Sequence, residues 1–332
     1  MAIRYAANTG NWSSLATWDG GASKPASGDT VVANGKTVTI DEDVDIGSGT
    51  IQTLAAGAAA SGGSFAVSSN RTLTMNALAG TTTCLSITSG DVTFNGNSTG
   101  SAATSSRHGI NWTSTGTLTF TGNATGGDAS SSYGLQGSAG TINFAGDVAP
   151  GTGVNAGNGI NAIGGAWNFL SGAFNPGSIL PMKSSSGSPV FTFAQNLTNN
   201  HATIALMNIS SGATATFNGT LTAVAGKNPL IEQVGNITYN GTLTAADGTP
   251  VVQCRTSAST STVNANLVYS ADGTPPIYSN ATAAIPKIVV HSTNALTWTV
   301  AKSGGTRTLS TASGGGGGGC VVGSPIVKGL AQ

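Results

Sequence analysis

The chain has 332 residues, of which 49 are glycine, 12 are basic and 12 are acidic, and only 7% of its residues are charged. A net charge of zero without a Lys/Arg cluster argues against nucleic-acid binding, and no apolar run is long enough to span a bilayer. Ordinary globular domains have about a quarter of their residues charged. So low a charge indicates either an all-β rod decorated with Thr, Ser and Asn, or a surface covered by partners in an assembly.

Residues 1–60 are expected to form a region that caps the fold or attaches it to a partner. Trp12 and Trp18 lie in a turn-rich lead, ahead of two short strand patterns at 28–32 and 36–41. The open end of a repeating β fold exposes apolar side chains and unpaired strand edges. We therefore expect the two tryptophans to serve as a cap over the first coil.

Four of the twelve acidic residues crowd together after the second strand pattern, namely Asp41, Glu42, Asp43 and Asp45. Carboxylate oxygens can bind calcium. This cluster lacks the alternating ligands and the glycine of a calcium loop, so the sequence favours a solvated turn.

The cysteines and histidines do not predict a metal site or a disulfide framework. Cys84, Cys254 and Cys320 are odd in number and far apart, and the first two are expected to be small buried residues. Cys320 follows six glycines, so an intermolecular bridge there stays open. His108, His201 and His291 fall at different phases of the repeat described next. No metal and no other cofactor is expected.

A short phrase recurs eight times along the middle of the chain. It consists of an apolar residue, then Thr or Asn, then usually an aromatic residue. The copies end at Phe94, Phe120, Phe144, Phe169, Phe193, Phe217, Tyr239 and Val263, at intervals of 22 to 26 residues. A fixed period in this range is typical of repeat architectures. Alternation puts the first and third side chains on one face, so each phrase predicts a short strand with one buried face.

A second apolar pattern follows each phrase after about 12 to 16 residues, for example at 108–110, 133–135 and 158–160. Runs of Gly, Ser, Asn and Thr between these patterns supply turns. Short strands that repeat near 24 residues predict an all-β fold, a parallel β-helix of about eight rungs over residues 61–285, capped at both ends. Successive coils should stack, because one coil cannot bury its apolar face alone.

The pattern changes at about residue 286. Longer strand patterns at 288–290, 296–300 and 306–309 are expected to form a C-terminal β cap over residues 286–313.

Residues 314–332 form the last predicted segment, a glycine-rich tether and an apolar tail. The six glycines at 314–319 are typical of a flexible linker. A free tail would fray, but an apolar, β-branched tail is better suited to adding a strand to a neighbouring subunit. The residues expected to dock are Val321, Val322, Ile326, Val327 and Leu330.

Two aspartates are the candidates for catalysis. The sequence Ala-Asp-Gly-Thr-Pro occurs twice, one period apart, and contains Asp247 and Asp272. On adjacent rungs their carboxylates would lie roughly 5 Å apart, near the separation in retaining glycosidases. The same five residues are also the composition of a tight turn, and no aromatic sugar platform surrounds them. The sequence therefore favours a turn and a protein that is not an enzyme.

The middle residues of the phrases predict an outward ladder with one residue per rung. They are Thr93, Thr119, Asn143, Asn168, Thr192, Thr216, Thr238 and Thr262. Threonine is a good strand residue for a solvated face. A flat array could also order water, as in ice-binding solenoids, or pack against another copy. Because the two asparagines interrupt the array, subunit packing is favoured over ice binding, and the ladder is the expected assembly face.

In several features the chain resembles a class of bacteriophage virion proteins, the β-helical decoration, fibre and tailspike proteins. The features are the lead Asn11-Trp12, Trp18-Asp19-Gly20-Gly21 and Gly28-Asp29-Thr30-Val31, the Gly/Ser/Thr/Asn-rich rungs, and the glycine run that ends in Ser324-Pro325-Ile326-Val327. Such proteins are made in the host cytoplasm without a signal peptide, and they commonly form trimers. Residues 1–11 contain one Arg and no apolar segment, so no signal peptide is expected here.

The resemblance implies a non-enzymatic structural protein, a homotrimer located in the virion and bound to capsid or tail proteins, with host surface polysaccharide as a further partner. The chain departs from the class in having no long coiled-coil stalk and no depolymerase acid cluster. The alternatives are a tailspike-like enzyme that degrades polysaccharide, and a surface adhesin or ice-binding solenoid.

Overall fold

The structure, a computed structural model, describes residues 2–21, 23–53, 63–67, 69–79, 83–101, 107–153, 156–185, 187–246, 249–254 and 260–264, and beyond these the backbone of six strands. The fold is all-β and is a parallel β-solenoid, as the repeat predicts, with about ten turns rather than eight. In the part of the chain so described, the one helical element is η1 (Leu15–Thr17), and no helix is long or apolar enough to cross a membrane. The chain divides into unit 1, Met1–Ser185, and unit 2, Ser186–Gln332.

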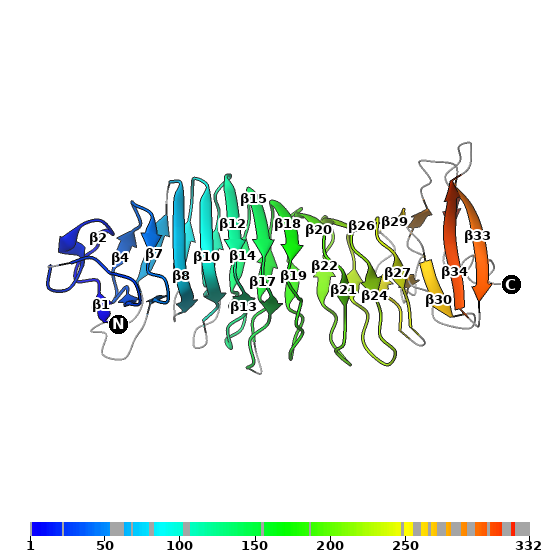
Figure 1. The fold of residues 1–332 in the computed structure, drawn as a ribbon, viewed down its shortest axis with the longest axis horizontal. Helices are drawn as coiled ribbons and strands as arrows, with labels where there is room; N and C mark the ends of the chain where they lie inside the picture. The colour runs from blue at the N-terminus through cyan, green and yellow to red at the C-terminus, as the bar shows by residue number, and fades with distance from the viewer. Residues whose placement is uncertain are drawn as a thin grey trace. The chain divides into compact units, whose positions relative to one another are not determined.

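In unit 1 the strands form two ladders, and β8, β10, β12, β15 and β18 lie side by side in Figure 1. The first ladder comprises β1 (Ile3–Tyr5), β3 (Thr30–Val32), β5 (Val44–Asp45), β6 (Thr50–Gln52), β8 (Arg71–Ala79), β10 (Val92–Thr99), β12 (Thr117–Thr121), β13 (Ala124–Thr125), β15 (Thr141–Ala145), β16 (Val148–Ala149) and β18 (Ala166–Ser171). The second comprises β2 (Gly10–Asn11), β4 (Thr37–Thr39), β7 (Ser64–Val67), β9 (Leu85–Ile87), β11 (Ile110–Trp112), β14 (Leu135–Gly137), β17 (Ile160–Ala162) and β19 (Met182–Ser184). The pairings within both ladders are parallel.

Unit 2 has three ladders. One contains β20 (Val190–Phe193), β23 (Thr214–Phe217), β26 (Asn236–Tyr239), β29 (Thr260–Val263), β32 (Lys287–Val290) and β35 (Cys320–Val322). The second contains β22 (Met207–Ile209), β25 (Ile231–Gln233), β28 (Val252–Cys254) and β31 (Ile277–Ser279). The third contains β21 (Leu197–Thr198), β24 (Leu221–Thr222), β27 (Leu243–Thr244), β30 (Leu267–Ser270), β34 (Thr306–Ser313) and β33 (Leu296–Ser303).

Each phrase is a strand whose aromatic residue points into the core, as the alternation predicts. In unit 1 the ring centroids of Phe94 and Phe120 are 5.1 Å apart, those of Phe120 and Phe144 are 5.1 Å apart, and those of Phe144 and Phe169 are 5.8 Å apart. All four rings are fully buried. Since equivalent residues are in register on neighbouring strands, the rings form one interior column.

Unit 2 has a corresponding column in its own core. Phe193 stacks on Phe217 with centroids 4.4 Å apart, and Phe217 lies 5.8 Å from Tyr239. The register of β20, β23 and β26 aligns these three positions. The degraded phrase that ends at Val263 continues the same ladder, opposite Tyr239.

Coiling already begins in residues 1–60. Ile3 pairs with Thr30 in a parallel ladder that continues to Thr50, and Ile51 pairs with Leu78. The solenoid therefore runs across the predicted boundary at residue 60, and this accounts for the larger number of turns.

Trp12 and Trp18 are both buried in this first part of the solenoid. Their rings meet edge to face with centroids 4.9 Å apart, and the Trp18 indole Nε1–H donates to the Trp12 carbonyl at 2.9 Å. Trp12 also lies 6.3 Å from Phe65, a core residue of β7. The two tryptophans thus contact the apolar interior at the N-terminal end of unit 1.

The three longer strand patterns expected after residue 286 are present as β32, β33 and β34. β33 and β34 pair along eight residues as an antiparallel hairpin, and β34 pairs antiparallel with β30. Figure 1 draws β33 and β34 side by side. The hairpin replaces the parallel pairing of the preceding turns.

The tail forms a strand, and the partner of this strand is in the same chain. Val321 and Val322 of β35 pair antiparallel with Val289 and Ile288 of β32, so this strand does not need a neighbouring subunit. The other predicted docking residues, Ile326, Val327 and Leu330, lie outside the described residues, as does the side chain of Cys320.

Replacing Phe144 by Ala should destabilise unit 1 by about 3–5 kcal/mol, because it removes a buried ring and leaves a cavity between two neighbours. Leu170→Ala is the control, since Leu170 is 54% exposed and should cost less than about 0.5 kcal/mol. Chemical denaturation followed by tryptophan fluorescence would measure both. Equal losses for the two variants would contradict a continuous aromatic column.

Deleting residues 314–332 should expose the edge of β32 and cause self-association, because an unpaired strand edge is a template for pairing. Val321→Pro should act in the same direction, since proline lacks the N–H that β35 would donate. Light scattering over a range of concentrations should give a higher mean mass than for the full chain. A lower mass would instead show that the tail bridges copies.

Candidate functional site

The outward residues of the phrases form the predicted ladder. In unit 1, Thr93 pairs with Thr119, Thr119 with Asn143, and Asn143 with Asn168. Thr72 of β8 precedes Thr93 in the same row. In unit 2 the row is Thr192, Thr216, Thr238 and Thr262, which we call the unit 2 threonine ladder. All of these residues except the exposed Thr72 are half-buried, so each unit presents an uncharged polar row.

Amide side chains in several rows bond to their equivalents one turn away. The Asn168 Nδ2–H donates to Asn143 Oδ1 at 2.9 Å. In the second ladder of unit 1, Asn161 Nδ2 donates to Gln136 Oε1 at 3.1 Å, and Gln136 Nε2 donates to Asn111 Oδ1 at 3.4 Å. These rows use their hydrogen-bonding groups on one another.

The row at the turns of unit 2 behaves in the same way. Asn240 Nδ2 donates to Asn218 Oδ1 at 2.8 Å, and Asn264 Nδ2 donates to Asn240 Oδ1 at 2.9 Å. Such rows stabilise the stack of turns and leave fewer groups for a ligand.

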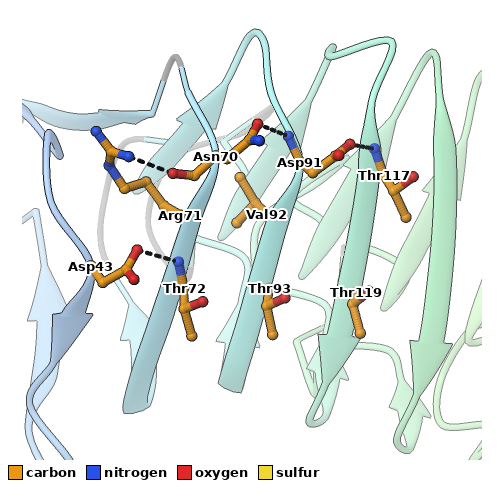
Figure 2. A pocket seen from close by; sticks show the side chains of 9 residues that line it. All are labelled: Asp43, Asn70, Arg71, Thr72, Asp91, Val92, Thr93, Thr117 and Thr119. Carbon is orange, nitrogen blue, oxygen red and sulfur yellow. Dashed lines mark hydrogen bonds between the residues drawn. The ribbon is translucent and has the colours of Figure 1, made fainter.

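A groove with a volume of about 450 Å³ opens on the outer face of unit 1, where β8, β10 and β12 begin (Figure 2). It is lined by Asp43, Asn70, Arg71, Thr72, Asp91, Val92, Thr93, Thr117 and Thr119. We call it the β8–β12 groove. Its residues come from consecutive turns of the solenoid. Residues that are 20 or more positions apart in the sequence therefore lie close together in the groove.

Hydrogen bonds between consecutive turns hold the polar residues of the groove (Figure 2). Asp91 accepts the Thr117 N–H at 2.7 Å through Oδ1, and its own N–H donates to Asn70 Oδ1 at 2.9 Å. Asp43 accepts the Thr72 N–H at 2.8 Å. Each carboxylate therefore has one oxygen fixed by the neighbouring turn.

Arg71 supplies the positive charge of the groove. Its Nη2–H donates to the Asp41 carbonyl oxygen at 2.6 Å, and Nη1 donates to the Asn70 carbonyl oxygen. Its Nε is buried without a hydrogen-bond partner. With Asp43 and Asp91, the groove has one positive and two negative side chains.

The aspartate carboxylates elsewhere in the described residues make the same kind of contact with the backbone. Every aspartate in the described part of the chain accepts at least one backbone N–H. They are Asp19, Asp29, Asp41, Asp43, Asp45, Asp91, Asp128 and Asp147. Of the acidic cluster, Glu42 forms an ion pair with Lys24. No group of three His, Cys, Asp or Glu side chains that could hold a metal occurs among the described residues.

Hydrogen bonds set the acidity of three of these aspartates. The Thr152 and Gly153 N–H groups lower the pKa of Asp128. Burial raises the pKa of Asp29, but N–H bonds from Ala26 and Ala2 and the charge of Arg4 outweigh it, so the pKa is lowered. For Asp41, burial is likewise outweighed, here chiefly by the two hydrogen bonds from Ser13.

The catalytic candidates, Asp247 and Asp272, lie outside the described residues. Ala246 and Thr249, which flank the first of them, form an antiparallel bridge with two backbone hydrogen bonds of 3.3 and 3.0 Å.

The histidines lie in separate environments. His108 is buried and stacks on Tyr133 with ring centroids 5.1 Å apart, and its Nδ1 accepts the Tyr133 N–H at 3.4 Å. Burial, and then the charge of Arg107, lower the pKa of His108 to about 4. His201 Nδ1 accepts N–H groups of its own turn, and His291 is outside the described residues. Cys84 is buried, and its thiol donates to the Ile51 carbonyl oxygen at 3.7 Å.

Asn70, Arg71 and Asp91 belong to no motif that was predicted from the sequence. Asn70 and Asp91 come directly before the first residue of β8 and of β10. That position, one residue ahead of a strand on adjacent turns, is the signal that would have found them.

No known protein family, curated protein or solved structure matches this chain. Its function is therefore inferred from the geometry and from the sequence features.

His108 should make the fold acid-sensitive above the range in which the aspartates titrate. Its folded pKa of about 4 lies below its ordinary value of 6.5, so its contribution is complete above pH 6.5 and is lost as the pH falls to about 4. The loss would reach about 3 kcal/mol. The aspartates with lowered pKa lose their contribution only below their ordinary pKa of 3.8.

Thermal unfolding between pH 7 and pH 4 would test this. His108→Gln should flatten the decline, whereas His201→Gln, at a turn where the imidazole is not buried, should leave it as in the wild type. An unchanged decline in His108→Gln would assign it to other groups.

Proposed function

We propose that this chain is a non-enzymatic structural protein of a bacteriophage virion, which assembles through the unit 2 threonine ladder. The observation that carries the assembly part of the proposal is the ladder itself. Thr192, Thr216, Thr238 and Thr262 lie in register, one per turn, half-buried and without a charge among them.

The physical chemistry of this row suits packing between copies. Removing short neutral side chains from water is cheaper than burying charges, which must be paired. The centres of protein interfaces are depleted in charged residues for the same reason. A chain with 7% charged residues has an unusually small number of side chains that oppose such packing.

The contacts of the carboxylates support a role without catalysis. A catalytic acid or base needs a carboxyl group within reach of a reacting proton and with a pKa matched to its task. All eight described aspartates instead accept backbone N–H groups, and the pKa values of Asp29, Asp41 and Asp128 are lowered. Six of these bonds join residues that are 24 to 29 positions apart, about one turn.

The virion, the homotrimer and the capsid or tail partners rest on the resemblance of the lead and the glycine run to phage β-helical proteins. The solenoid fold is consistent with fibre and tailspike proteins. The assembly contact is placed on unit 2 because its row is threonine throughout, whereas the row of unit 1 contains two asparagines and the β8–β12 groove.

Thr216→Arg should break the assembly, because the four threonines of the ladder offer no carboxylate that could pair with the new guanidinium group. Light scattering after size exclusion should give a trimer for the wild type and a monomer for this variant. Thr222→Arg is the matched control, a half-buried threonine in β24 of another ladder, and it should remain trimeric. A monomeric wild type, or equal disruption by both variants, would contradict the proposal.

A further inference from the structure

The β8–β12 groove contains hydrogen-bonding groups that the protein does not use. Among the described residues, no hydrogen bond involves the hydroxyl groups of Thr72, Thr93, Thr117 or Thr119. The second carboxylate oxygens of Asp43 and Asp91 are likewise without a protein donor, since each bond described above uses Oδ1. In the neighbouring turns, by contrast, Asn143 and Asn168 bond to each other.

The chemistry of these groups selects the ligand. Carboxylate oxygens accept from O–H donors in short, strong bonds, and threonine hydroxyls both donate and accept. A ligand that pairs with Asp91 and with the threonines beside it must itself carry several hydroxyl groups close together. The apolar contact is limited to the threonine methyl groups, because the side chain of Val92 is buried in the core, and a few methyl groups suffice for the C–H groups of one sugar ring.

The volume and the net charge of the groove further limit the class of ligand that fits it. A volume of about 450 Å³ falls in the range of small-ligand sites, about 300–1,000 Å³. Asp43 and Asp91 against Arg71 leave one net negative charge, which disfavours uronic acids and phosphates. The absence of three metal-ligating side chains among the described residues disfavours a cation site.

We propose that the β8–β12 groove binds a neutral sugar unit, whose hydroxyl groups donate to Asp91 and whose oxygens accept from the hydroxyl groups of Thr93, Thr117 and Thr119. All residues that line the groove belong to unit 1, whereas the threonine ladder belongs to unit 2. Because no aromatic ring lines the groove, the affinity is weak, with a Kd on the order of 1–10 mM.

Saturation-transfer NMR with the intact chain would test this inference. The probes are the methyl glycosides of glucose, galactose, mannose and N-acetylglucosamine, each at about 10 mM, near the expected Kd. At least one should receive saturation from the protein, and glucuronic acid should not. No saturation transfer to any of the four neutral glycosides, or equal transfer to glucuronic acid, would overturn the proposal.

Variants locate the site. Asp91→Asn should weaken binding at least about tenfold, the effect of replacing one charged hydrogen bond, and Thr93→Val should weaken it while preserving the strand. Asp147→Asn is the matched control, because Asp147 accepts the Ala173 N–H at 2.8 Å, as Asp91 accepts that of Thr117, but does not line the groove. Wild-type binding in Asp91→Asn and Thr93→Val would overturn the assignment to this groove.

These tests are separate from those of the assembly. Thr216→Arg should bind the same glycoside as the wild type, because it alters unit 2 and leaves the groove intact. Loss of binding in that variant would overturn the placement of the sugar site in unit 1 alone. A failed trimer with retained binding would contradict the assembly proposal only.

Discussion

Register between successive turns is the constraint on which the rest of this structure depends. Parallel strands place a residue and its equivalent on the next turn one strand spacing apart, about 4.8 Å. The result is a set of columns, with Phe94 above Phe120 in the core and Thr93 beside Thr119 outside. Each property of a position is therefore repeated along its column, whether the repetition is favourable or not.

The same constraint explains the low charge. Like charges at one strand spacing repel, so a column of lysines or glutamates would oppose the stacking that buries the aromatic residues. An amide can donate to one neighbour and accept from the other, as Asn240 does between Asn218 and Asn264. A carboxylate can only accept. The described aspartates accordingly accept backbone N–H groups, most of them from a neighbouring turn, as Asp91 does from Thr117.

The strands were predictable where the alternation of buried and outward residues coincided with the repeat of about 24 residues, as at Phe120 and Phe217. The first turns were not, because Thr30 and Thr50 are only 20 residues apart and no aromatic residue marks their strands. The groove was not predictable from composition, since it depends on which turns become neighbours. The partner of the tail could not be predicted from the sequence either, because an apolar β-strand can pair with its own chain or with another copy.

Side-chain length determines where the polar side chains on the outer face of this solenoid hydrogen-bond to one another and where they leave their groups to other partners. An asparagine or glutamine reaches its equivalent on the next turn, as the 2.9 Å bond between Asn168 and Asn143 demonstrates. A threonine hydroxyl sits on Cβ and hardly spans the same spacing. Thr50 and Thr30 come only to 3.5 Å, the limit of a hydrogen bond. A row of threonines therefore leaves its hydroxyl groups to water, to another protein surface or to a ligand. Both proposed surfaces, the unit 2 threonine ladder and the β8–β12 groove, follow from this one difference between threonine and asparagine.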